Sequence, residues 1–137
     1  MSFMNAVDTN VLLYACDKSD VRRHSIARAI IRQTEGGVIL WQVAAEFVAA
    51  ARRLEVRGFT REIAWARLKN FLHVYRLVFP TRRVMDDAQR LHAEQQWSFW
   101  DAMIAAACLD AGVTRLYSED LPGRAPPQPL EIINPFA

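Results

Sequence analysis

Cysteine is scarce in this sequence, and its two occurrences suggest neither a disulfide nor a metal site. Cys16 and Cys108 each lie inside an apolar helical pattern, without a second ligand at metal spacing. We therefore expect both to be reduced residues of the core. No apolar run approaches the roughly 20 residues that cross a membrane, and no basic stretch precedes an apolar run near the N-terminus. These absences predict a soluble, cytoplasmic protein.

Two other familiar patterns are also missing. The five glycines stand at helix ends and turns, so the sequence has no glycine-rich phosphate-binding loop. The three histidines, His24, His73 and His92, fall on separate predicted helices without a partner acid or cysteine at ligand spacing, so we expect surface or hydrogen-bonded residues. The tryptophans lie in or beside apolar patterns and are expected in the core or in an interface: Trp41, Trp65, Trp97 and Trp100.

Lysine is almost absent from the basic residues. Fifteen of the 17 are arginine, and only Lys18 and Lys69 are lysine, while the net charge is only +2. Arginine binds phosphate in a bidentate way and stacks on bases, so this bias suits an RNA partner. A GC-rich genome, whose codons favour arginine, explains the bias equally well. If RNA binds, several arginines could guide its phosphate backbone, among them Arg22, Arg23, Arg82 and Arg83.

Short apolar strands alternate with helices along a chain whose 137 residues fit a single domain, 1–137. The pattern predicts strands at 4–7, 38–41, 76–80, 114–117 and 130–133. It predicts helices near 11–15, 21–35, 43–57, 61–75, 83–96 and 98–111. Such alternation indicates an α/β sandwich with a parallel sheet, and ligands bind beyond the carboxyl ends of such strands.

Four carboxylates follow or interrupt apolar segments, where a charge must be paired, hydrogen-bonded or neutralised. They are Asp8, Glu46, Asp101 and Asp120. The strand pattern places Asp8 and Asp120 at the ligand-binding edge of the sheet. If the fold gathers all four, the simplest common partner is a hard divalent ion such as Mg²⁺ or Mn²⁺, which favours oxygen ligands. The pattern then predicts a metal-dependent phosphodiesterase.

Three of these acids also have a purely structural interpretation. Asp8 fits the N-cap of the helix that follows it. Asp101 stands three residues after Ser98, which is the spacing of a capping box. Asp120 occupies a loop, where acids are common, and its neighbour Glu119 competes for the same role.

Glu46 is harder to explain as a structural residue. No basic side chain lies one helical turn away, where an ion pair would form. Glu46 is then either a solvated glutamate on an exposed helix face, or an acid on an alanine-rich surface suited to close approach by a partner.

The local sequences around these acids are distinctive. They are VDTNVLLYA at 7–15, Glu46 within a small-residue helix, FWDAMIAAA at 99–107, LYSEDL at 116–121 and INPF at 133–136. Together they closely resemble the PIN-domain ribonucleases of the VapC toxin type. The resemblance runs from near residue 5 to the C-terminus and keeps the order and spacing of all four acids.

The resemblance implies a three-layer α/β/α domain with a central parallel sheet, and RNA cleavage that depends on Mg²⁺, with Mn²⁺ as a substitute. It also implies homodimerisation and inhibition by a small antitoxin encoded nearby. By this resemblance Asp8 and Asp101 are the principal metal ligands, and Glu46 and Asp120 complete the acidic pocket. All four then count as catalytic residues.

Two further polar residues match the family, and one segment departs from it. Asn10 and Ser118 correspond to positions near the metal or the scissile phosphate. The proline-rich stretch 122–129 departs from the family, because relatives often have a polar, glycine-containing turn there. This difference concerns local substrate contacts and leaves the chemistry unchanged. In that chemistry the metal polarises the phosphoryl oxygen and lowers the pKa of a water, so no histidine or lysine base is needed.

Two rival interpretations remain. A response-regulator receiver domain also clusters acids at strand ends, but it needs a lysine after a late strand, and this chain has no lysine beyond Lys69. A catalytically silent PIN-like domain that binds RNA or a protein partner is the second alternative. The presence of all four acids argues against it.

Overall fold

The computed structural model describes residues 4–121 and 126–137. Its centre is a sheet of five parallel strands in the order β3-β2-β1-β4-β5. The strands are β1 Asn5–Val7, β2 Val38–Leu40, β3 Arg76–Val78, β4 Arg115–Tyr117 and β5 Glu131–Ile133. All five coincide with strands predicted from the sequence, and the parallel sheet is confirmed.

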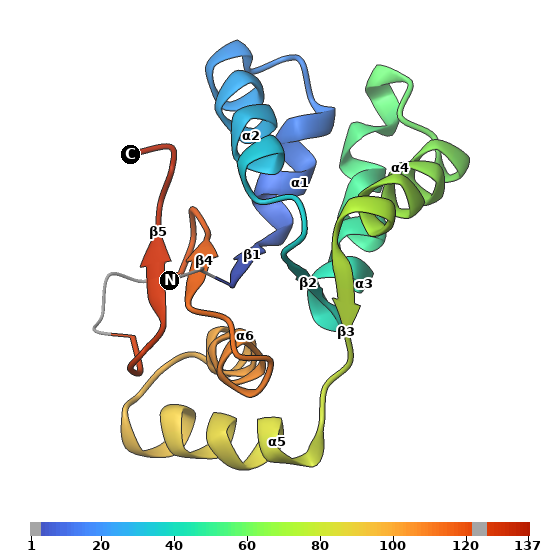
Figure 1. Ribbon diagram of the computed structural model, residues 1–137. Helices are drawn as coiled ribbons and strands as arrows, with labels where there is room; N and C mark the ends of the chain where they lie inside the picture. Colours follow the sequence, from blue (N-terminus) through green and yellow to red (C-terminus); the bar gives the residue numbers. More distant parts are fainter. Residues whose placement is uncertain (1–3, 122–125) are drawn as a thin grey trace.

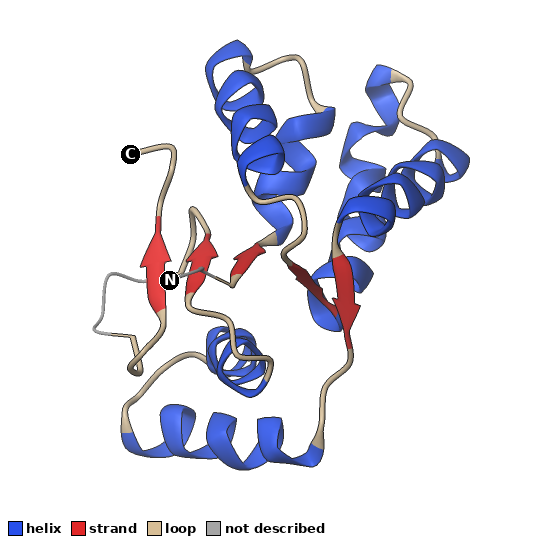
Figure 2. Ribbon diagram, in the orientation of Figure 1, coloured by secondary structure: helices blue, strands red, loops and turns tan. Residues whose placement is uncertain are grey.

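Helices cover the sheet on both sides. They are α1 Thr9–Cys16, α2 Val21–Gln33, α3 Trp41–Ala50, α4 Arg61–Val74, α5 Arg82–Gln89 and α6 Phe99–Asp110. A 3₁₀ segment, η1 Ala51–Arg57, continues α3, and a π-helical turn, η2 Arg90–Glu94, continues α5. In Figure 1, α1, α2 and α4 lie on one side of the strands, and α5 and α6 lie on the other. Figure 2 shows the strands as a middle layer between these helices, which is the predicted α/β/α arrangement.

The helix boundaries differ from the sequence-based prediction in three places. Strand β2 ends at Leu40, and Trp41 already belongs to α3, because its half-exposed side chain does not fit a fully buried strand. The helix predicted over 43–57 tightens into a 3₁₀ segment after Ala50. It still ends at Gly58, whose φ of +84° suits glycine. The helix predicted over 83–96 becomes a π turn in its last residues.

The core forms where the buried faces of helices meet the strands. Val7, Ile39 and Leu116 are fully buried in three neighbouring strands, and Phe47 packs from α3. Cys108 is buried and Cys16 is partly buried, and both are free thiols as expected. Among the tryptophans only Trp97 is a core residue, at 3% exposed. The other three are 49–64% exposed, so of the two predicted locations, core or interface, they do not occupy the core: Trp41, Trp65 and Trp100.

The strand order reverses beside β1, and this creates the position for a site. From β1 the chain proceeds to β2 and β3 on one side, and later returns to β4 and β5 on the other. Segments that follow β1, β2 and β4 therefore meet at one edge of the sheet, where α/β proteins bind ligands. No helix in the described ranges, 4–121 and 126–137, is long and apolar enough to span a membrane.

Candidate active site

Asp8 is the most buried of the acids at this edge, with 7% of its surface exposed. It directly follows the central strand β1 and caps α1, and its Oδ1 accepts a hydrogen bond of 2.8 Å from the backbone N–H of Thr9. The predicted N-cap role is thus confirmed. Burial raises the pKa of Asp8, and the negative charges of Glu46 and Asp120 raise it further. Asp8 is therefore both a cap and a member of a group of acids.

Ser118 is brought to Asp8 by the strand register. Val7 pairs with Tyr117 in the parallel ladder, and the backbone N–H of Asp8 donates to the Tyr117 carbonyl oxygen at 2.9 Å. The next residues along each strand, Asp8 and Ser118, are therefore neighbours. The Ser118 hydroxyl donates to Asp8 Oδ2 at 2.7 Å and is fully enclosed. Both oxygens of the Asp8 carboxylate thus accept one hydrogen bond and are held in a fixed orientation.

Glu46 approaches from α3, the helix after β2. Gln42, one turn earlier, donates to Glu46 Oε1 at 2.7 Å, and the hydroxyl of Thr9 lies 3.4 Å from Glu46 Oε2. These contacts orient the side chain towards α1. They do not neutralise its charge, because both donors are uncharged.

Asp120 and Glu119 have different hydrogen-bond partners. Asn10 of α1 donates to Asp120 Oδ2 at 2.6 Å. Glu119 instead accepts from the Tyr14 hydroxyl at 2.7 Å and from Arg23 Nε at 2.9 Å. Glu119 therefore bonds to Tyr14 and Arg23, and Asp120 is the acid that faces Asn10.

Asp101 occupies the first turn of α6, and the structure separates its backbone and side-chain roles. Its N–H donates to Ser98 Oγ at 3.3 Å, so the predicted Ser98 cap is present. Within the described residues the Asp101 carboxylate makes no hydrogen bond, so the reciprocal half of a capping box is absent, and no hydrogen bond links it to Asp8 or Glu46. Its neighbours Trp100 and Met103 line the same groove as Glu46.

The donor set suits a hard cation, although the side chains are not closed around one. The donors are all oxygens, and in the described part of the chain no arginine or lysine pairs with Asp8, Glu46 or Asp120. In that same part, no three histidine, cysteine or acidic side chains are arranged to hold an ion together. Mg²⁺ keeps several waters and is usually held by one or two carboxylates. The residues therefore fit a hydrated Mg²⁺.

Two polar residues of this site were missed by the sequence analysis. Gln42 stands four residues before Glu46, so helical spacing alone would have identified it as a partner, had uncharged donors been considered. Thr9 follows Asp8 directly but reaches Glu46 from a different element, and no local pattern indicates that contact. Outside the site, His24 and His92 place Nδ1 within 2.9 Å and 2.8 Å of backbone carbonyl oxygens, as expected for satisfied histidines.

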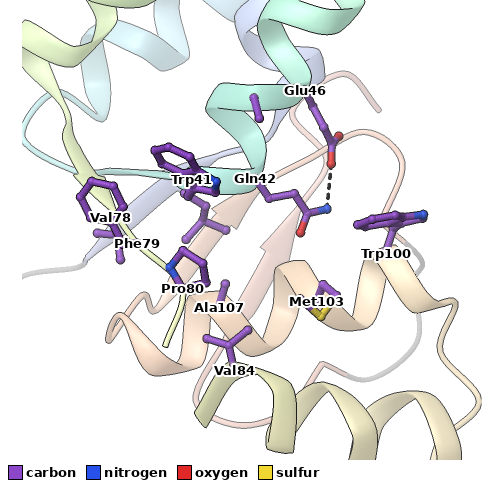
Figure 3. Close-up of a pocket in the computed structure, with 12 residues that line it drawn as sticks. Trp41, Gln42, Glu46, Val78, Phe79, Pro80, Val84, Trp100, Met103 and Ala107 are labelled. Atoms are coloured by element: carbon purple, nitrogen blue, oxygen red, sulfur yellow. Dashed lines mark hydrogen bonds between the residues drawn. The ribbon is translucent and has the colours of Figure 1, made fainter. Parts of the chain in front are cut away.

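A large groove of about 640 Å³ adjoins Glu46 and is mostly apolar. Figure 3 shows Glu46 hydrogen-bonded to Gln42 on one wall, with Trp41 on the same helix and Trp100 on the facing one. Trp41 stacks obliquely on Phe79, with ring centroids 5.2 Å apart. Trp41, Phe79 and Trp100 are each about half exposed or more. Glu46 therefore lies beside aromatic surface that the described part of the chain leaves exposed.

The arrangement of acids, sheet edge and helices agrees with a known family. The family model of the PIN domain matches residues 6–121. The chain belongs to the PIN domain family. All four acids lie inside the matched segment, as do Asn10 and Ser118. The proline-rich departure noted in the sequence falls after it, and its residues 122–125 lie outside the described part of the structure.

Solved structures share the fold of this PIN domain at low sequence identity. The Mycobacterium tuberculosis VapC20, a sarcin-ricin loop cleaving toxin, has a TM-score of 0.68 and 20% identity, over 85% of this chain and 89% of that one. VapBC2 from Rickettsia felis, bound to a DNA fragment from its promoter, has a TM-score of 0.70 and 16% identity, over 96% and 98%. PAE2754 from Pyrobaculum aerophilum has a TM-score of 0.57 and 22% identity, over 88% and 82%. Comparison with curated protein sequences gave no significant match.

Proposed function

We propose that this PIN domain is a divalent-metal-dependent endoribonuclease that acts as the toxin of a toxin–antitoxin pair. One observation carries the proposal: Asp8 is buried at the carboxyl edge of the sheet beside the charges of Glu46 and Asp120, without a basic partner among the described residues. Such a group of acids is stabilised when a cation binds. Membership in the PIN family supports nuclease chemistry at this position.

Asp8 and Asp101 would be the principal ligands of Mg²⁺ or Mn²⁺, with Glu46 and Asp120 completing the pocket. A bound ion supplies charge stabilisation at the phosphoryl oxygen and a water of lowered pKa. The chain's own residues fix the ligands in place. Ser118 and the Thr9 N–H hold Asp8, and Gln42 holds Glu46.

Asn10 and Asp120 form the outer part of the site. This bond leaves Asp120 Oδ1 and the side-chain oxygen of Asn10, Oδ1, without a hydrogen bond from the described residues. We propose that these atoms contact the substrate phosphate through water or the ion, since Asp120 is exposed while Asp8 is not.

The partners follow from the same proposal. VapC20 is a toxin that cleaves the sarcin-ricin loop, and VapBC2 was solved with promoter DNA. By analogy, RNA is the substrate, a small antitoxin encoded nearby is the inhibitor, and the site of action is the cytoplasm. The exposed aromatic residues Trp41, Phe79 and Trp100 offer a surface for a homodimer or for the antitoxin.

The alternative is a catalytically silent PIN domain that binds RNA or a protein partner. One observation favours it: no three acids in the described residues are already arranged around an ion position. A functional nuclease would then need side-chain movement on metal binding.

Cleavage of labelled RNA distinguishes the two functions. Purified protein should cut structured or ribosomal RNA in Mg²⁺ or Mn²⁺ and stop in EDTA. Asp86→Asn serves as a matched control, because Asp86 is an exposed acid on α5 away from the site. This variant should retain wild-type activity. Cleavage that continues undiminished in chelator would exclude the metal mechanism, and binding without cleavage would favour the silent alternative.

A further inference from the structure

A second, smaller groove of about 250 Å³ opens beside Asn10. One wall is a single face of α1, and the other comes from the end of α3 and from η1. Its lining residues are Asn10, Leu13, Tyr14, Asp17, Ala50, Arg53, Leu54 and Arg57. At 1.5 Å per residue, the α1 wall from Asn10 to Asp17 is roughly 10 Å long. Asn10 also donates a hydrogen bond to Asp120, so one residue belongs to both the groove and the acidic site.

Of the two arginines in this groove, Arg57 has an acidic partner and Arg53 has none among the described residues. Arg57 pairs with Asp17 at 3.0 Å, so these two charges compensate each other. Tyr14 is bonded to Glu119, which is itself paired with Arg23.

Arg53 has no such acid. The only hydrogen bond from its guanidinium to the described residues is a long one, 3.4 Å from Nε to the Ala50 carbonyl oxygen of its own helical segment. The side chain is exposed. The groove therefore contains one arginine whose charge no acid of the described chain compensates.

We propose that Arg53 binds a phosphate of the RNA strand that flanks the cleaved bond, with the groove along α1 as the path of the strand. The inference depends on the proposed nuclease function, since it assumes that the scissile phosphate lies at the acids. An uncompensated guanidinium selects an anionic occupant, and its planar fork matches phosphate in a bidentate way. A strand that passes Asn10 brings its next phosphates into this groove. Arg53 is thus a binding residue, remote from the reacting atoms.

The test compares two arginines that are adjacent in sequence. Arg53→Gln removes the proposed contact. Arg52→Gln is the matched control, because it removes the same charge from the same segment, while Arg52 lines a different cavity between η1 and α4. The probe is fluorescein-labelled single-stranded RNA. Its binding is followed by anisotropy in EDTA over a range of salt concentrations, and its cleavage is followed in Mn²⁺.

Arg53→Gln should raise KM roughly tenfold with little change in kcat, as expected for the loss of one charged hydrogen bond to bound substrate. It should also make the salt dependence shallower. The slope of log K against log salt is negative, and its magnitude should fall by about 0.7, the value for one phosphate contact on a single strand. Arg53→Lys should restore the slope and only part of the affinity, since it keeps the charge without the bidentate geometry. Arg52→Gln should leave KM and the slope close to wild type.

The outcomes separate this proposal from the proposed nuclease function. If the wild type cuts RNA but Arg53→Gln keeps the wild-type KM and salt slope, the phosphate subsite is wrong and the nuclease stands. Equal losses in Arg52→Gln and Arg53→Gln would also overturn it, by indicating a diffuse charge effect. A wild type that neither binds nor cuts RNA overturns both.

Discussion

Ser98 and Asp101 share the first turn of α6 but have different contacts. Ser98 Oγ accepts from the Asp101 N–H, whereas the Asp101 carboxylate has no hydrogen bond within the described residues. The sequence alone could not separate the two, because the capping-box spacing fits both roles. The backbone contact assigns the capping function to Ser98. The Asp101 side chain then remains available for a ligand.

Substitutions at these two residues should therefore have opposite effects. Ser98→Ala should lower the free energy of unfolding by about 0.5–2 kcal/mol through loss of the cap, and retain cleavage. Asp101→Asn should change it by less than about 1 kcal/mol, since only the interaction with the helix dipole is lost. It should nevertheless abolish Mn²⁺-dependent cleavage. Melting curves and RNA cleavage check both variants, and a destabilised but fully active Asp101→Asn protein would show that Asp101 is structural.

At the scale of elements, the loop after β4 is held by side chains from α1 and α2. Glu119 accepts from Tyr14 and Arg23, and this places the next residue, Asp120, against Asn10. Burial tends to raise the pKa of Glu119, but the bonds from Tyr14 and Arg23 outweigh it and the pKa is lowered. Burial and the Glu119 contact raise the pKa of Tyr14 to about 12. The network is therefore fully formed at neutral pH.

Glu119→Gln should reduce stability at neutral pH by about 1 kcal/mol, because Arg23 is partly exposed and solvent screens the pair. A lowered pKa means that this contribution is present above the ordinary value of 4.5 and is lost as the pH falls through the folded-state pKa. The difference between wild type and variant, measured by denaturant unfolding, should thus shrink in acid. Glu131→Gln is the control, since its pair with Arg115 is more exposed and should contribute little. A difference that stays constant down to strongly acidic pH would contradict the network.

The elements were largely predictable from the sequence, whereas the contacts among them were not. Buried strands such as 38–40 and glycine stops such as Gly58 leave local signals, so the order and type of the elements were correct. The change to a 3₁₀ segment at Ala51 has no such local signal. Likewise, the different contacts of Asp120 and Glu119 depend on Asn10 and Tyr14, which are more than 100 residues away in sequence.

At the scale of the whole molecule, the acids, the phosphate groove and the aromatic groove are neighbours. Asn10 belongs to the acidic site and to the smaller groove, and Glu46 belongs to the acidic site and to the larger one. On the proposed function, this arrangement would let a strand of RNA and a protein partner approach the acidic site from different grooves. The sequence indicated the acids through their positions at apolar segments, whereas it left open whether Trp41 and Trp100 lie in the core or in an interface.

In the proposed function, the acids around Asp8 repel one another until a divalent ion binds. Because folding raises the pKa of Asp8, its ionised form opposes folding above that pKa, and the opposition fades as the pH falls. Asp8→Asn removes this charge and retains groups that can hydrogen-bond to Ser118 and Thr9. The metal-free variant should therefore be at least as stable as wild type at neutral pH.

The most direct test is a set of melting curves for wild type, Asp8→Asn and the exposed control Asp86→Asn, each in EDTA and in Mn²⁺. In wild type and Asp86→Asn, Mn²⁺ at a hundred times its Kd should add about 2.7 kcal/mol of stability. Asp8→Asn should melt no earlier than wild type in EDTA and should lose most of the Mn²⁺ response. An Asp8→Asn protein that is less stable in EDTA and is stabilised by Mn²⁺ as strongly as wild type would contradict the account.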